Sequence, residues 1–218
     1  VDGDVVETGA TKRGRAYGDF RKPVRWGSSG GRAGTFSKTS SSGGGRIHVV
    51  ADSMTILGVI SSNSQEPQKG LWTNRNGDQA AGGGAGGSIF LEVTTLIGTG
   101  TIQANGGEGY AKRQSHMARA CGGGGGRVAV ITPNQFPSTI TLEAFGATYL
   151  AEGNAAPANT AETWKQQIPG GAGTVFIQDQ SRPLGSLIIK NNLDALDPTT
   201  TVPSVPPRSL LFCFHSKN

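Results

Sequence analysis

The strongest constraint on the fold is an internal repeat that recurs about every 40 residues. Residues 43–63 (GGGRIHVVADSMTILGVISSN) and 85–105 (AGGSIFLEVTTLIGTGTIQAN) align without a gap at a shift of 42. In this alignment Ile47 meets Ile89, and Ile60 meets Ile102. A chain with such a period is expected to stack similar units on one another, burying a shared core.

Two further copies follow, near 124–147 and 171–192. The third copy places Val128 and Val130 on Ile89 and Leu91, and Leu142 on Ile102; the fourth places Val175 and Ile177 on Val128 and Val130, and Leu187 and Ile189 on Ile140 and Leu142. Residues 1–9 resemble the end of a copy, because Gly3, Val5 and Gly9 fall on Gly100, Ile102 and Gly106. The chain is therefore expected to belong to a longer array, with a repeat domain over 1–192 and a proline-containing tail over 193–218.

Each copy alternates apolar with small or polar residues in short period-2 pieces, which indicates strands. We therefore predict an all-β chain folded as a right-handed parallel β-helix (β-solenoid) of about four coils. Its long glycine-rich insertions (10–42, 64–84, 107–123 and 148–170) would stack at one corner. The apolar residues of each copy should form buried rows. Three further predictions concern particular positions. His48, Phe90 and Ala129 should form an outward row, and Asn63, Asn105 and Asn192 should recur at one corner, where Asn tolerates the left-handed conformation. The glycines that precede each copy should form tight turns with positive φ.

The aromatic residues give the clearest functional signal. Every Trp and Tyr, and most Lys and Arg, lie in the insertions, while the net charge of +5 comes from residues 1–50. Side chains gathered on one face of an array can bind a partner or a glycan. The candidate contact residues are Tyr17, Trp26, Trp72, Tyr110, Tyr149, Trp164, Arg25, Lys112 and Arg113. The alternative is that these rings only cover the glycine strands beside them.

Motifs for enzymatic chemistry are weak. Gly82, Gly84 and Gly87 match a dinucleotide fingerprint, but a strand-like sequence follows where a phosphate site needs a helix. The acidic residues form no cluster, and the histidines form no ligand pair. We therefore expect no enzyme, cofactor or metal site, no nucleic-acid partner and no membrane span. Whether Cys121 and Cys213 pair is left open.

The segments YGDFRKPVRWGSSGG (17–31), 43–63 and GGGAGGSIFLEVTTLIGTGTIQANGG (82–107) resemble the glycine-rich β-helix arrays of large secreted surface proteins of bacteria and protists. This resemblance implies a non-enzymatic structural module at the cell surface or outside the cell, in a filament, a flagellar hair-like appendage or an adhesin. Open array ends predict head-to-tail self-association. The alternative is a carbohydrate-binding or polysaccharide-cleaving β-helix that uses the aromatic and basic insertions.

Overall fold

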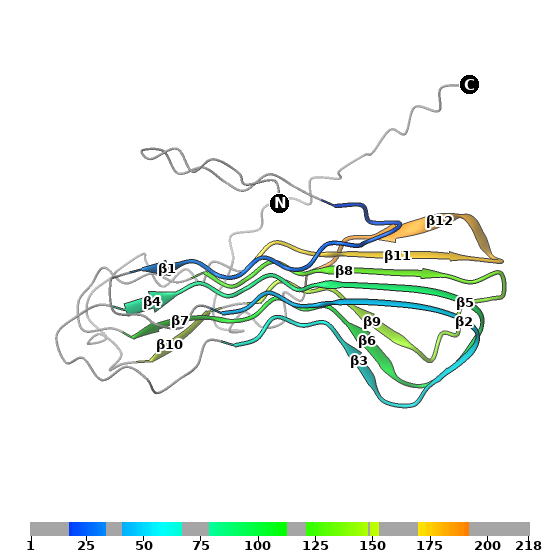
Figure 1. Cartoon of the computed structure of the whole chain (residues 1–218), viewed down its shortest axis with the longest axis horizontal. Coiled ribbons are helices and arrows are strands. Elements are labelled where there is room, and N and C mark those ends of the chain that lie inside the picture. Colours follow the sequence, from blue (N-terminus) through cyan, green and yellow to red (C-terminus); the bar gives the residue numbers. More distant parts are fainter. Residues whose placement is uncertain are drawn as a thin grey trace, which may run out of the picture.

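The structure is a computed structural model that describes residues 18–33, 41–66, 79–112, 121–147, 149–152 and 170–191. Within these ranges it contains three sheets and no helix (Figure 1). A five-stranded sheet has the order β12-β11-β8-β5-β2 and consists of β12 (Arg182–Ile188), β11 (Thr174–Asp179), β8 (Arg127–Ile131), β5 (Ser88–Gly98) and β2 (Arg46–Ile56). A three-stranded parallel sheet contains β3 (Val59–Ser61), β6 (Thr101–Gln103) and β9 (Thr141–Glu143). A four-stranded sheet contains β1 (Arg32–Ala33), β4 (Gln79–Ala81), β7 (Gly109–Lys112) and β10 (Tyr149–Glu152).

The predicted pairing of the first three copies is confirmed residue by residue. β2 pairs with β5 in parallel, with Ile47 opposite Ile89, and β5 pairs with β8, with Ile89 opposite Val128. In the smaller sheet Ile60 lies opposite Ile102 and Ile102 opposite Leu142. The alignment of the repeats therefore gives the register of β2, β5 and β8 in the five-stranded sheet and of all three strands in the three-stranded sheet.

The predicted right-handed parallel β-helix of about four coils is wrong. Two of the three sheets are mixed, with antiparallel pairs at β11·β12 in the five-stranded sheet and at β1·β4 and β4·β7 in the four-stranded sheet. In the fourth copy β11 still pairs with β8 in the predicted register, with Val175 opposite Val128. The second half of this copy breaks the pattern, because β12 folds back on β11 and places Leu187 opposite Phe176. The reversal follows Asp179, whose buried carboxylate accepts hydrogen bonds from the backbone N–H groups of Arg182 (2.8 Å) and Phe136 (3.1 Å). These bonds stabilise a tight turn where continued stacking had been expected.

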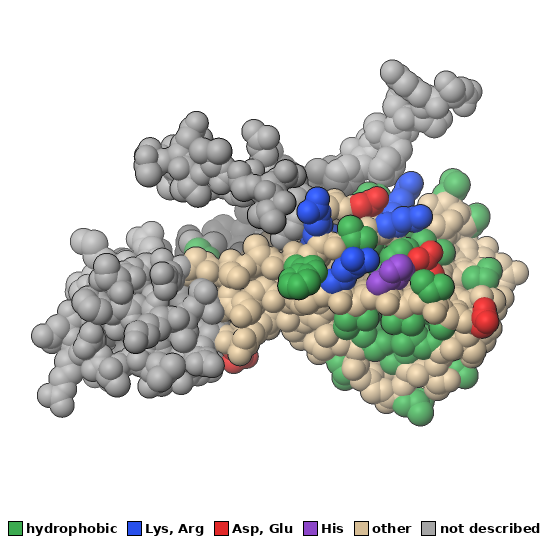
Figure 2. Space-filling model, in the orientation of Figure 1, with side chains coloured by type: hydrophobic (Ala, Val, Ile, Leu, Met, Phe, Trp, Pro, Cys, Tyr) green, Lys and Arg blue, Asp and Glu red, His purple; other side chains and the backbone are tan. Residues whose placement is uncertain are grey.

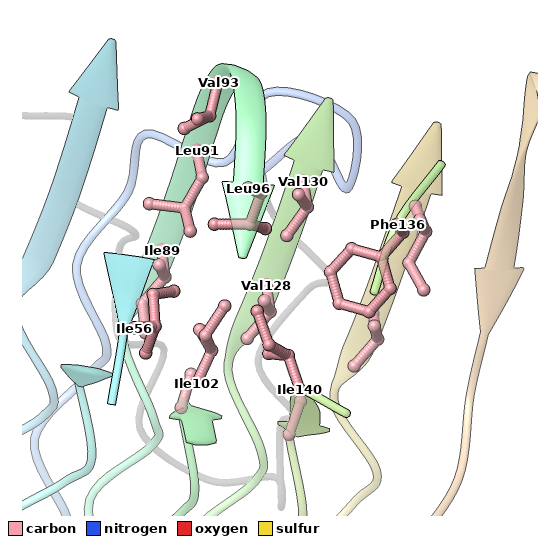
Figure 3. Close-up of a cluster of buried hydrophobic side chains, with 14 residues drawn as sticks. Ile56, Ile89, Leu91, Val93, Leu96, Ile102, Val128, Val130, Phe136 and Ile140 are labelled. Carbon is pink, nitrogen blue, oxygen red and sulfur yellow. The ribbon is translucent and has the colours of Figure 1, made fainter. Parts of the chain in front are cut away.

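The main core lies between the five-stranded and three-stranded sheets (Figure 3). Its inner members Ile89, Leu91 and Ile102 have no exposed surface. Phe136, from the segment after β8, packs beside β11 and closes the core where the three-stranded sheet has ended. The predicted burial of the apolar rows is thus correct for Ile89, Leu91, Ile102, Val128, Val130, Val175 and Ile177, whereas Leu142 and the edge residues Ile47, Val49 and Ile60 are only partly buried.

The predicted outward row of His48, Phe90 and Ala129 is wrong for two of its three members. Phe90 and Ala129 are 3% and 0% exposed, and with Phe176 they form a second apolar cluster. Residues 18–26 run across the outer face of the five-stranded sheet, where Phe20 packs on this cluster (Figure 1). Phe20 packs edge-on against Phe176, with ring centroids 5.5 Å apart. His48 is exposed and stacks on Phe90 at 4.8 Å.

The glycine-rich segments hydrogen-bond sideways to one another between the sheets. In residues 82–87, the N–H groups of Gly82 and Ala85 donate to Gly31 and Ser28, whereas Gly83 and Gly86 donate to Cys121 and Gly124. Every third residue thus faces the same neighbour, as in a polyproline II helix. The prediction of positive φ for the glycines that precede each copy is wrong, because among the described residues positive φ occurs only at Gly18, Gly98 and Gly185, which lie elsewhere. The runs therefore need glycine chiefly because their backbones pack too closely for a side chain.

The predicted asparagine corner is realised as a ladder between side chains and backbone. The side-chain oxygen of Asn63 accepts from the backbone N–H of Asn105 (2.7 Å), and that of Asn105 accepts from Phe145 (2.8 Å). Asn191 continues the series by accepting from Gly146 (2.8 Å). None of these residues has the left-handed conformation that had been expected, and Asn192 lies outside the described residues.

Candidate functional site

The first candidate site is the open edge formed by β2 and β3, here called the head edge. β2 is the last strand of the five-stranded sheet and β3 the last strand of the three-stranded sheet. Because β3 follows β2 after only two residues, the two sheets end at the same side of the molecule (Figure 1). A strand at a sheet edge has one row of backbone groups without a strand partner, which can receive another chain.

Apolar side chains are exposed along the head edge. Ile47, Val49, Met54 and Ile60 point toward the core but are only partly buried, because no further copy packs on them. Val50 and Val59 are 72% and 62% exposed on the outer faces of the same strands. Figure 2 shows hydrophobic side chains exposed between the two sheets at this edge. The head edge therefore combines free strand edges with the unfinished end of the core.

The second candidate site is the opposite edge of the five-stranded sheet, here called the tail edge and formed by β12 with Ile189. β12 has β11 on one side and no described strand on the other. Leu184 is 88% exposed, and Ile188 and Ile189 are 41% and 51% exposed. Below this edge lies a cavity of about 210 Å³ between β9 and β12, bordered by Leu142, Val175, Ile188 and Lys190. The tail edge thus also exposes apolar side chains beside a free strand.

A third surface lies over the outer face of the five-stranded sheet and carries basic and aromatic residues. Trp26 is 72% exposed, and Arg25 next to it is exposed as well. The Ser88 hydroxyl fixes this segment by donating to the Arg25 carbonyl oxygen (2.5 Å). His48 bonds Glu92 through Nε2 at 2.9 Å. Figure 2 shows Lys and Arg side chains and a histidine gathered beside hydrophobic side chains on this face.

The predicted contact residues that the structure describes lie on two different parts of the molecule. Arg25 and Trp26 lie on the segment that covers the five-stranded sheet, whereas Tyr110, Lys112 and Tyr149 lie on β7 and β10 of the four-stranded sheet. In that sheet Tyr149 lies opposite Gly109, and Tyr110 opposite Leu150. The remaining candidates, Tyr17, Trp72, Arg113 and Trp164, lie outside the described residues.

Three of the described carboxylates, those of Glu92, Glu143 and Asp179, have side-chain partners within the protein. Glu92 bonds His48, and Glu143 accepts a hydrogen bond from the amide of Asn105 (2.9 Å). Asp179 is buried and pairs with Arg182 (2.6 Å). Hydrogen bonds from the Arg182 side chain, helped by Ser181 and the Phe136 N–H, hold the pKa of Asp179 well below its usual range against the opposing effect of burial. Asp179 therefore stays ionised and stabilises the turn.

The described part of the chain offers neither a metal-binding cluster nor a membrane-spanning helix. No group of three or more His, Cys, Asp and Glu side chains there could hold a metal ion. No helix in those ranges is long and apolar enough to cross a membrane. Cys121 is exposed and has a free thiol, and Cys213 lies outside the described residues.

The edge residues were missed as functional candidates, although the alignment contained a signal for some of them. Val59 is in an outward position that is occupied by Thr101 and Thr141 in the second and third copies. Val50 is in an outward position that is occupied by Glu92 in the second copy. An outward position that is polar in an interior copy and apolar in the first copy suggests a contact surface. Comparison of the copies could not predict the exposure of Leu184 and Ile188, because this exposure depends on the hairpin of β11 and β12, which was not predicted from the sequence.

Comparison with known proteins adds no relative. No family model matches the sequence, and no curated protein or solved structure is significantly similar to it.

Proposed function

We propose that this chain is a non-enzymatic structural module that associates with copies of itself head to tail, in an extracellular or cell-surface filament, hair-like appendage or adhesin. The observation that carries the self-association is the placement of exposed apolar side chains at both edges of one sheet. Val50 and Val59 are exposed at the head edge, and Leu184 and Ile188 at the tail edge. The extracellular setting rests on the resemblance of the repeats to those of large secreted surface proteins.

The two edges are complementary in strand direction. β2 runs parallel to β5, β8 and β11, whereas β12 runs antiparallel to β11. If a second copy is placed by translation along the sheet, its β2 runs antiparallel to the β12 that it meets. Antiparallel pairs form well-aligned hydrogen bonds and are slightly more stable per residue than parallel ones. A head-to-tail contact therefore needs no rotation between copies, and its repetition gives an open assembly.

Glycine at the head edge also favours a close neighbour there. A Cβ on Gly173 would overlap the carbonyl oxygen of Gly126, one on Gly126 would overlap Gly87, and one on Gly87 would overlap Gly45. Each glycine in this row makes room for the preceding copy. Gly45 is the last of the row, and no described atom lies within 4 Å of a Cβ built on it. Glycine at this position is explained if another backbone packs against the head edge.

Sedimentation velocity over a range of protein concentrations tests this proposal. We expect the wild-type chain to form species larger than a monomer as concentration rises. Val50→Lys places a charge on the β2 edge and should shift the distribution toward monomer, since lysine on an edge strand opposes pairing. Val24→Lys is the matched control, because Val24 is 44% exposed but lies on the covering segment. A wild-type chain that stays monomeric at all concentrations would contradict the proposal.

A carbohydrate-binding function is the second candidate, and the exposure of Trp26 beside Arg25 favours it. An exposed indole can stack on a sugar ring, and a neighbouring guanidinium can bind a uronate carboxylate. Affinity for polygalacturonate should then fall in Trp26→Ala and Arg25→Ala but not in Val24→Ala. If the wild-type chain and all three variants bind polygalacturonate equally weakly, a glycan site at Trp26 and Arg25 is contradicted.

A further inference from the structure

We propose that residues 3–9 of the chain add to the free edge of β3 as a fourth parallel strand, with Val5 beside Ile60. This proposal concerns the three-stranded sheet and is independent of self-association through β2 and β12. The occupant is a segment of the same chain that precedes the described residues. It would complete the lower half of the head edge and leave the edge of β2 free for another copy.

The surface that would receive this segment is incomplete in two respects. Ile60 is partly exposed, whereas Ile102, the next residue of its row, is completely buried. The hydrogen bonds between β3 and β6 leave Val59 and Ser61 facing away: Thr101 N–H donates to Gly58, and Ser62 N–H donates to Gln103. Since alternate residues of a parallel strand face opposite neighbours, the backbone groups of Val59 and Ser61 point to the open side.

The occupant is identified by the same alignment that gives the observed register. That alignment pairs Ile47 with Ile89, Ile89 with Val128 and Ile60 with Ile102, and all three pairs are present in the sheets. Applied to the start of the chain, it places Gly3 on Gly58, Val5 on Ile60 and Gly9 on Ser64. Val5 is therefore the residue that would extend the core-facing row of Ile60, Ile102 and Leu142.

The glycine at position 58 is further evidence for a strand beside β3. A Cβ on Gly100 would overlap the carbonyl oxygen of Gly58, so Gly100 makes room for the preceding copy. Gly58 occupies the same position one copy earlier, has no positive φ, and has no described atom within 4 Å of a built Cβ. A strand with Gly3 beside Gly58 would account for a glycine that the described contacts leave unexplained.

The connection is long enough for this placement. Gly18, the first described residue, lies against the guanidinium of Arg127 on the outer face of the five-stranded sheet. From there to the far side of β3 the path crosses the strands toward β2 and then the gap between the sheets, about 25 Å in all from standard spacings. The chain from Gly9 to Gly18 can span about 30 Å when extended. An intramolecular strand is therefore possible without moving any described element.

The test is disulfide trapping in a chain whose own cysteines are removed by Cys121→Ser and Cys213→Ser. The in-register pair is Asp4→Cys with Val59→Cys, and Val59 is exposed, so the change leaves the core intact. The matched control is Asp4→Cys with Ser61→Cys, which is two residues out of register. Neighbouring parallel strands bring paired Cα atoms within the range that a disulfide spans, so we expect the in-register pair to oxidise at least about tenfold faster, within monomers.

Hydrogen exchange provides a second readout that does not need new cysteines. The amides of Val59 and Ser61 should be protected in the wild-type chain and lose that protection in Val5→Asp, while the amide of Ile102 stays protected in both. Equal oxidation rates for the two cysteine pairs, or cross-links only between chains, would overturn the proposal. So would fast exchange of Val59 and Ser61 in the wild-type chain.

Discussion

At the scale of single residues, Asp179 matters most for the departure from the repeat pattern. Its carboxylate is buried and accepts hydrogen bonds from the Arg182 side chain, the Ser181 hydroxyl and the backbone N–H groups of Phe136 and Arg182. These contacts join the turn after β11 to the segment that carries Phe136 into the core. The side chain therefore stabilises both the hairpin and the end of the core.

Asp179→Asn should lower the free energy of unfolding by about 2–3 kcal/mol at pH 7, because it breaks a buried ion pair. The pKa of Asp179 is lowered in the folded chain. Its contribution is therefore present above the unfolded-state pKa of about 4 and is lost as pH falls below that value. Urea unfolding at pH 7 and pH 3 should show a smaller difference between wild type and variant at the lower pH. A difference that does not change with pH would argue against the ionised pair as its cause.

Residue-level prediction from sequence was correct where a side chain faces a neighbouring copy and failed where it faces another part of the chain. Ile89 and Ile102 were assigned to the core from alternation alone, and they are fully buried. Phe90 was assigned to the outer face by the same rule, yet it is buried under the segment that contains Phe20. Alternation gives the face of the sheet, but it does not tell whether that face is covered.

At the scale of elements, the glycine segments between the sheets are the distinctive feature. Their backbones lie so close that a Cβ on Gly123 would overlap the carbonyl oxygen of Gly84. The N–H of Gly123 donates to Gly107 at 2.8 Å, so the segment is also held by hydrogen bonds to its neighbours. Close approach, more than turn formation, therefore explains the abundance of glycine.

Gly123→Ala should destabilise the protein by about 1–3 kcal/mol, because the added methyl group forces packed backbones apart. Gly171→Ala is the matched control in the same kind of segment, since no described atom lies within 4 Å of a Cβ at that position. The control should change stability by no more than about 0.5 kcal/mol. Thermal unfolding of both variants checks the prediction. Equal melting temperatures would contradict the close backbone packing at Gly123.

Elements of the first three copies could be predicted because each has a similar neighbour. β2, β5 and β8 share one pattern and pair in the expected register. β12 could not be predicted in this way, because its residues align with a copy while its direction is set by the turn at Asp179. The four-stranded sheet was also missed, because its strands are only two to four residues long and lie in segments that had been interpreted as insertions.

At the scale of the whole molecule, the two edges of the five-stranded sheet differ. The head edge ends in β2, with β3 beneath it, whereas the tail edge ends in the reversed strand β12. Both expose apolar side chains, including Val50 at the head edge and Leu184 at the tail edge. Two unlike but complementary edges favour an open head-to-tail assembly over a closed dimer.

Mixing two edge variants tests this claim most directly. Val50→Lys blocks the head edge and Leu184→Lys blocks the tail edge, so neither variant has both edges that a head-to-tail contact needs. Sedimentation velocity should show each variant alone as a monomer. A mixture should form a one-to-one dimer, in which the free tail edge of the first variant meets the free head edge of the second. A mixture that stays monomeric, or either variant forming a polymer alone, would contradict head-to-tail association through these edges.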